Sequence, residues 1–370
     1  MWLVYTLLFV PHVAAWTNHY SLSEGEVART WQSIAMSADG SKLATVKNGE
    51  NIWLSSDSGT TWDEVTGMGN GKDWQSIAMS DDGSTIAAVV RGGKIRISTD
   101  SGSTWGQDSL AATFDWQSIA MSSDGTKMFA VVRNGKLYKS TDSGATWVEV
   151  IGSAKLWNCI ATSGDGQTVA AVVGGGAIWI SYDEGAIWTD HFSDDGRTWR
   201  FIAMSADGSK MAAVTNSRIW RSTDSGAQWT RITSVSGEWR SITMSDDGSR
   251  VAAVIKEGNP WTSTDSGATW VEDTSVGMTE NWISIASSSD GSQLAASSDN
   301  GYVWTHTIPS PPSPPASPGS SAGISGDPHL RGAHGEPRRA RVHCTRTHCS
   351  AACRSPPPKL TRMRAAIVRR

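Results

Sequence analysis

The strongest constraint on the fold is a repeat with a period of about forty residues. Copies of the phrase WQSIAMS-x-DG, some of them looser, begin at seven tryptophans: Trp31, Trp74, Trp116, Trp157, Trp199, Trp239 and Trp282. The gaps between successive leading tryptophans are 43, 42, 41, 42, 40 and 43 residues. A repeat of this length is typical of a propeller blade built from four strands. The sequence therefore predicts seven blades.

Within each repeat, short apolar runs alternate with turn signals. Residues 86–90 read IAAVV and residues 146–150 read TWVEV, and such runs are separated by Asp-Gly or Ser-Gly pairs. Short runs rich in β-branched residues between turn residues indicate strands and hairpins. No segment shows sustained helical periodicity. We therefore expect an all-β fold, a seven-bladed β-propeller of four-stranded blades that spans residues 16–308.

The ends of this region indicate how the ring closes. The seventh repeat stops after its third strand, YVWTH at 302–306, and lacks a fourth. The segment AAWTNHY at 14–20, which contains Trp16, precedes the first repeat and reads as a displaced strand. We expect it to pair with the last repeat, so that the ring leaves no sheet edge exposed.

A second phrase, Ser-x-Asp-x-Gly-x-x-Trp, recurs in six of the seven repeats, four of which have Thr before the Trp. Its aspartates are Asp57, Asp100, Asp142, Asp183, Asp224 and Asp265. Asp accepts hydrogen bonds from backbone N–H groups further along a turn, and Gly adopts the positive φ that such turns need. Burial of the following Trp stabilises the turn by up to about 4–6 kcal/mol at ~25 cal/mol/Å². Because six aspartates spread round a ring cannot converge on one substrate, we expect a structural role; a ring of Ca²⁺ sites is the alternative.

This second phrase resembles the Asp-box, or bacterial neuraminidase repeat (BNR), of sialidases, sortilin-type receptors, xyloglucan-active hydrolases and photosystem II assembly factors. The resemblance implies a propeller, and it implies no particular activity because these families do different things. Sialidase chemistry would need three Arg, a Tyr nucleophile with a Glu base, and an acidic Asp, and the family's Phe-Arg-Ile-Pro phrase is missing here. No motif in the sequence distinguishes a pair of carboxylates as a glycosidase site. We expect no catalytic residues, no cofactor and no metal.

Candidate binding residues lie in the turns that differ between repeats. In a four-stranded blade, the turns after strands two and four share one face, which we call the variable face, and loops that vary on a regular scaffold favour binding. The candidates are Lys47, Arg91, Lys94, Arg133, Lys136, Asp194, Asp195, Arg218 and Lys256. We expect them to form a polar funnel for a glycan or protein ligand; the alternative is that they are solvated turn charges without a ligand.

The two ends of the chain differ from the repeats in composition. Residues 1–15 read as a signal peptide. Residues 309–323 are rich in Pro and Ser, as in extended linkers of extracellular plant and algal proteins. Residues 324–370 read as a basic, Cys-containing, disordered tail, whose stretch 325–337 resembles the start of a von Willebrand factor type D domain. Residues 309–370 carry 11 Lys and Arg against 2 Asp and Glu, so the chain's net charge of −4 leaves −13 for residues 1–308.

These observations favour a secreted, non-catalytic binding or scaffold propeller, expected to be a monomer, with no nucleic-acid partner and no transmembrane segment. One alternative is a glycoside hydrolase of sialidase or xyloglucanase type. A second alternative is a photosystem II assembly factor-like protein in a thylakoid lumen, against which the short N-terminal segment argues.

Overall fold

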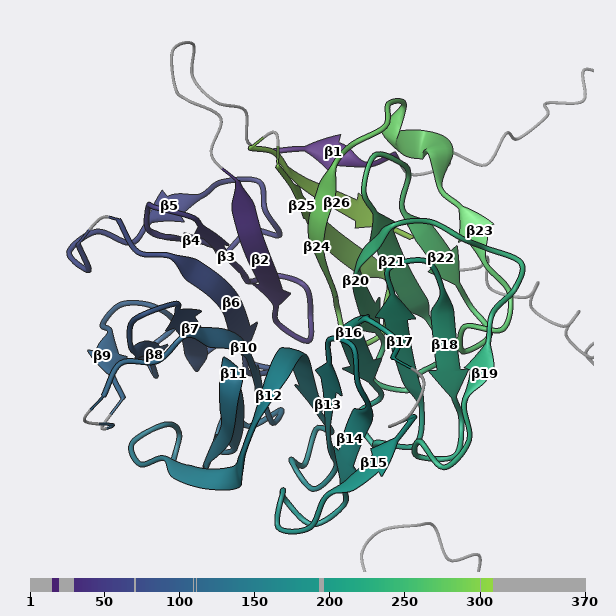
Figure 1. Cartoon of the computed structure of the whole chain (residues 1–370). Helices are drawn as coiled ribbons and strands as arrows, with labels where there is room; N and C mark the ends of the chain where they lie inside the picture. Colours follow the sequence, from purple (N-terminus) through teal and green to yellow (C-terminus); the bar gives the residue numbers. More distant parts are fainter. Residues whose placement is uncertain are drawn as a thin grey trace, which may run out of the picture. The chain divides into compact units, whose positions relative to one another are not determined.

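The computed structural model describes residues 15–19, 30–69, 71–108, 110, 112–192, 196–299 and 301–308. These residues form antiparallel β-sheets that radiate from a common centre, as Figure 1 shows. Apart from one 3₁₀ turn, η1 (Thr274–Val276), the described residues contain only strands and irregular segments. The all-β prediction is confirmed. The predicted signal peptide (except Ala15), linker and tail lie outside the described residues.

Five of the sheets have four strands each. The first repeat forms β2 (Trp31–Met36), β3 (Leu43–Lys47), β4 (Ile52–Ser55) and β5 (Asp63–Glu64). The second forms β6 (Trp74–Met79), β7 (Ile86–Val90), β8 (Ile95–Ser98) and β9 (Gly106–Gln107). The fifth forms β16 (Trp199–Met204), β17 (Met211–Thr215), β18 (Ile219–Ser222) and β19 (Thr230–Arg231). The sixth forms β20 (Trp239–Met244), β21 (Val251–Ile255), β22 (Trp261–Ser263) and β23 (Val271–Glu272). The last sheet contains β24 (Trp282–Ser287), β25 (Gln293–Ser298), β26 (Val303–Thr307) and β1 (Thr17–Asn18).

The prediction of seven separate blades is wrong, because the described strands form six sheets. The third and fourth repeats share one six-stranded sheet: β10 (Trp116–Met121), β11 (Met128–Ser140), β12 (Val148–Thr162), β13 (Val169–Val173), β14 (Ile178–Ser181) and β15 (Thr189–His191). The physical reason is β12, which runs without a break from the end of the third repeat into the fourth. Its residues 148–156 pair with β11, and its residues 157–162 pair with β13.

Six of the strands nearest the centre begin with a leading tryptophan, and Trp157 lies within β12; these indoles fill the space between repeats. All seven are at most 1% exposed. Trp74, Trp157 and Trp282 each donate an indole N–H to a backbone carbonyl of the preceding repeat. The second strands, such as β7 and β17, are buried along their whole length. Ala and Val predominate in these strands, because small side chains let sheets pack closely on both faces.

A closed ring of backbone hydrogen bonds ties all seven repeats together on the face opposite the variable face. The turn after the first strand of each repeat donates one N–H to the carbonyl of the next, at 2.7–2.9 Å. In order, these residues are Ala38, Asp81, Ser123, Gly164, Ala206, Asp246 and Ser289, and Ser289 donates back to Ala38. The repeats therefore form a closed circle although two of them share a sheet.

The segment around Trp16 completes this circle, as predicted. β1 pairs antiparallel with β26, so a strand from the start of the chain becomes the fourth strand of the last sheet (Figure 1). Trp16 is 5% exposed, and its indole N–H donates to Asp273 at 2.9 Å. Its ring stacks on His306 with the ring centroids 5.2 Å apart and lies 5.6 Å from Trp282. Burial lowers the pKa of His306, although Asp273 partly offsets this effect.

The six Ser-x-Asp-x-Gly turns, which we call Asp turns, share one hydrogen-bond network. In the turn of Asp142, the Ser140 hydroxyl donates to Oδ1 at 2.7 Å, and Thr146 donates its N–H to Oδ1 and its hydroxyl to Oδ2. The same serine accepts the N–H of Gly144, whose φ is 84°. The Ser-to-Asp and Gly-to-Ser bonds recur around Asp57, Asp100, Asp183, Asp224 and Asp265. Each carboxylate thus stays within its own turn.

No helix among the described residues is long and apolar enough to cross a bilayer.

Candidate binding sites on the variable face

Backbone hydrogen bonds hold the variable turns against the loops that precede each first strand. Arg91 donates its N–H to the carbonyl of Asp73, and Arg133 donates to that of Asp115, both at 2.8 Å. Lys256 makes the same contact with Glu238 at 2.8 Å. The two loop sets of the variable face are therefore joined pairwise, and their side chains share one surface.

Five of the seven predicted basic residues carry an acidic partner. Lys47 is buried at 2% exposure, lies 3.0 Å from Glu50 and sits over the Trp31 ring. The other four pairs are Arg91 with Asp73 at 3.3 Å, Lys94 with Asp108 at 3.2 Å, Lys136 with Glu149 at 2.7 Å and Lys256 with Glu257 at 3.7 Å. These local pairs neutralise most of the expected funnel of positive charge. Asp194 and Asp195 lie outside the described residues.

Arg133 lines a cavity of about 580 Å³, which we call the aromatic cavity. Phe114 and Tyr138 line it too, with their ring centroids 5.3 Å apart. Within the described chain, the exposed side chains of Arg133 and Asp115 form no hydrogen bond or ion pair, and both line this cavity. Burial raises the pKa of Tyr138, and the nearby Glu149 raises it further. The phenol therefore stays neutral at physiological pH.

Arg218 lines a second cavity of about 260 Å³, which we call the arginine cavity. Arg197 and Arg231 line it as well, together with Trp220, Thr215, Asn216, Ser217 and Thr198. The Arg197 guanidinium stacks on Trp220 at 4.3 Å and on Phe192 at 4.7 Å. Burial lowers the pKa of Arg197, and the positive charge of Arg231 lowers it further. The guanidinium groups thus repel one another at this site.

Neither Arg218 nor Arg231 forms an ion pair among the described residues, and the surrounding sequence adds to the positive charge. Residues 194–240 carry seven Lys and Arg against five Asp and Glu, a net charge of +2, within a region 1–308 that carries −13. Clustered cations on an otherwise acidic body attract anionic groups, and guanidinium groups are suited to bidentate contacts with carboxylates.

Sequence reasoning missed a polar position that recurs beside the leading Trp. It is the residue directly after the leading Trp in six repeats: Gln32, Gln75, Gln117, Asn158, Arg200 and Arg240. Asn158 donates to the carbonyl of Trp199 at 2.6 Å, and Arg200 bonds Asn216, which lines the arginine cavity. Arg240 pairs with Glu238 at 3.0 Å. The repeat alignment could have revealed these residues, because they occupy one fixed position beside a conserved core Trp.

Within the described range, no group of three or more His, Cys, Asp or Glu side chains lies close enough to hold a metal ion. The single cysteine in that range, Cys159, is buried, and burial raises its thiol pKa. The Asp-turn carboxylates are engaged by their own turns, and their pKa values are lowered, chiefly by these hydrogen bonds. Such carboxylates are charged at neutral pH and are poor general acids.

No protein-family model matches the sequence, and no curated protein matches it. The fold is similar to those of 1772 chains of known structure, so the fold by itself selects no function. One is YCF48 from Cyanidioschyzon merolae, with a TM-score of 0.63 at 15% identity, covering 80% of this chain and 99% of that one. Another is YCF48 bound to a D1 peptide, with a TM-score of 0.64 at 17% identity, covering 79% and 97%.

A third similar structure is Raptor from Chaetomium thermophilum, with a TM-score of 0.62 at 14% identity, covering 82% of this chain and 30% of that one. At these identities the similarity shows the fold alone. The chain is a β-propeller.

Proposed function

We propose that this chain is a non-catalytic propeller that binds a segment of a protein partner on its variable face, with a carboxylate of that segment held in the arginine cavity. The observation that carries the proposal is the pair Arg218 and Arg231, two cations without acidic partners among the described residues, lining one cavity. Stacking against Trp220 holds the third guanidinium, that of Arg197, in place and so reduces the entropy lost on binding.

A protein partner has more support than a glycan. A similar propeller, YCF48, has been solved with a D1 peptide bound, which shows that a ring of this kind can hold a peptide. Of the alternatives weighed from the sequence, the photosystem II assembly factor-like function also implies a protein partner, and it gains support in the same way. A thylakoid-lumen location goes with that alternative, and fractionation of cells that express a tagged chain tests it against secretion.

Titration of short fluorescent peptides into the protein tests the proposal. We expect a peptide with two Glu and a free C-terminus to bind, and its Gln-substituted, amidated counterpart to bind at least tenfold more weakly. The double variant Arg218→Gln/Arg231→Gln should lose at least tenfold in affinity for the acidic peptide. Arg133→Gln is the matched control, because Arg133 is an exposed arginine of the same face that lines another cavity and forms no ion pair within the described part of the chain.

Equal binding of the acidic and neutral peptides, or an unchanged affinity of the double variant, would refute the proposal. Incubation with oligosaccharides separates it from the hydrolase alternative, since release of shorter products would show catalysis.

A further inference from the structure

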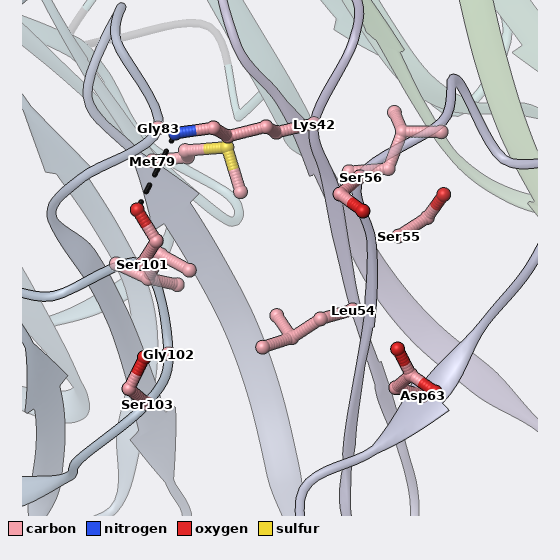
Figure 2. A pocket seen from close by; sticks show the side chains of 12 residues that line it. Lys42, Leu54, Ser55, Ser56, Asp63, Met79, Gly83, Ser101, Gly102 and Ser103 are labelled. Carbon is pink, nitrogen blue, oxygen red and sulfur yellow. Dashed lines mark hydrogen bonds between the residues drawn. The ribbon is translucent and has the colours of Figure 1, made fainter.

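A pocket of about 290 Å³ opens between the first and second sheets, on the side of the molecule that carries the Asp turns. We call it the sheet-gap pocket. Its apolar wall is formed by Leu43 and Leu54 of the first sheet and by Met79 and Ile86 of the second. The Asp turn at Ser101–Ser103 forms one rim, and Ser55 and Ser56 form another (Figure 2).

The length of the Ile86 side chain is one reason why this gap is open. Ile86 begins the second strand of its repeat, and Met128 and Met211 hold the corresponding positions of the third and fifth repeats. If Gly144 or Gly226 carried a Cβ atom, that atom would lie 3.4 Å from the sulfur of Met128 or Met211, respectively. The methionine therefore reaches the Asp turn in those repeats. For a Cβ atom on Gly102, the equivalent glycine of the second repeat, the three nearest atoms all belong to Leu54 and none to Ile86. The shorter Ile86 side chain therefore leaves space where methionine reaches the turn.

Two charged side chains stand at opposite ends of the pocket, with Leu54 between them (Figure 2). Lys42 donates to the carbonyl of Asp82 at 2.8 Å and to the Ser101 hydroxyl at 3.3 Å, which leaves one of its three N–H donors open. Lys127, its counterpart in the third repeat, is instead neutralised by Glu184 at 2.8 Å. In the described structure the exposed Asp63 carboxylate forms no hydrogen bond or ion pair.

We propose that the sheet-gap pocket binds an extended peptide segment of a protein partner, in which an aliphatic side chain enters the apolar wall and is flanked by an acidic residue at Lys42 and a basic residue at Asp63. The charges select this occupant, because Lys42 and Asp63 lie at the two ends of one pocket with an apolar wall, and neither forms an ion pair among the described residues. An extended chain places groups about 7 Å apart at every second residue, which suits recognition at separated points.

This site is independent of the arginine cavity, since it lies among the turns of the opposite face and shares no residue with that cavity. The two sites can therefore be tested separately.

Isothermal titration with the peptide Ac-Lys-Gly-Leu-Gly-Glu-NH₂ tests the proposal. Ile86→Met places in the pocket the residue that the third and fifth repeats already use, and we expect it to weaken peptide binding at least tenfold while the melting temperature stays equal or rises. Ile86→Val is the matched control, because it enlarges the pocket by one methylene and should keep the affinity within about twofold. Replacing the peptide's Leu by Ala, or its Lys and Glu by Gln, should each weaken binding at least fivefold.

An Ile86→Met protein that melts normally and binds the peptide as tightly as the native chain would overturn the proposal, and so would equal affinity for the Gln-substituted peptide. Both Ile86 variants should keep the affinity for the acidic peptide of the variable face, so failure here is distinguishable from failure at the arginine cavity.

Discussion

The Asp turn shows how far single residues can be understood from the sequence. The repeated phrase predicts that Gly144 has a positive φ and that Asp142 bonds its own turn, and both features are present. The structure adds that Ser143, between them, also has a positive φ, of 54°. A non-glycine residue rarely adopts this conformation, so residue type alone does not predict it. The surrounding hydrogen bonds impose it.

Replacing Asp142 by Ala tests the structural role of these aspartates. The change removes the acceptor of three hydrogen bonds, from the Ser140 hydroxyl and from the N–H and hydroxyl of Thr146. We expect the melting temperature to fall by a few degrees, with peptide binding at both proposed sites unchanged, since neither pocket contains this turn. Asp115→Ala is the control, because it removes the same charge from an exposed side chain without turn bonds. Lost binding at unchanged melting temperature would contradict a structural role.

The predicted binding residues are less predictable than the turns, because the sequence does not show which acidic side chain pairs with a given basic one. Lys94 pairs with Asp108 and Lys136 with Glu149, across 14 and 13 positions of sequence. These partners face each other only when the third and fourth strands of a repeat have paired with each other. Among the described residues, Arg133 and Arg218 differ from the other predicted basic residues in forming no ion pair, which becomes visible only in the folded sheet.

At the scale of elements, the repeat period predicted the strands well and the sheet boundaries less well. In six of the seven repeats the first strand begins at the leading Trp, and in the fourth the leading Trp157 lies inside β12. The merging of the third and fourth repeats follows from β12, where the segment VEVIGSAKL lacks the long Gly-rich loop found at TGMGNGKD after the first repeat. A short connection between two repeats can either continue as one strand or form a turn. The outcome depends on how it pairs with the strands on either side, here β11 and β13, and the local sequence does not encode that pairing.

Closure of the ring by β1 makes a specific prediction about Trp16. This strand is only two residues long, and the Trp16 indole beside it is buried against the last sheet. Trp16→Ala should cost about 3–5 kcal/mol of unfolding free energy, as for other buried aromatic residues cut back to Ala. Chemical denaturation followed by Trp fluorescence measures the loss. Ile187→Ala, at a side chain that is 72% exposed, is the control and should change stability by less than about 0.5 kcal/mol.

An unchanged denaturation midpoint for Trp16→Ala would show that the ring does not depend on its N-terminal strand.

At the scale of the whole molecule, stability rests on features that every repeat supplies in the same way. The ring of seven backbone bonds links one turn per repeat, and each of those turns is itself held by an aspartate, such as Asp82 bonded by Ser80 and Ser84. Each Asp turn then donates a backbone N–H to the neighbouring first turn of its own repeat, as Ser101 does to Ser84. One face of the propeller is therefore a continuous set of carboxylate-stabilised turns.

This arrangement predicts an acid transition. Hydrogen bonds lower the pKa of Asp39, Asp82, Asp100, Asp247 and Asp265 to about 2. The unfolded chain binds these protons near the usual Asp value of about 3.9, so it takes up protons before the folded chain does. The stabilisation is therefore complete above about pH 4 and is lost as the pH falls towards 2.

Melting temperatures measured by circular dichroism from pH 7 to 2 should show a steep decline between pH 4 and 2. A shallower decline should begin below about pH 6.5, because burial lowers the pKa of His306 and of His19, and protonation of either favours the unfolded chain. Asp142→Ala should make the decline of the melting temperature between pH 4 and 2 less steep, since the pKa of that carboxyl is also lowered by its turn bonds. A melting temperature that stays constant down to pH 2 would show that the turns do not depend on ionised carboxylates, and the shared hydrogen-bond network would then not be what stabilises this face.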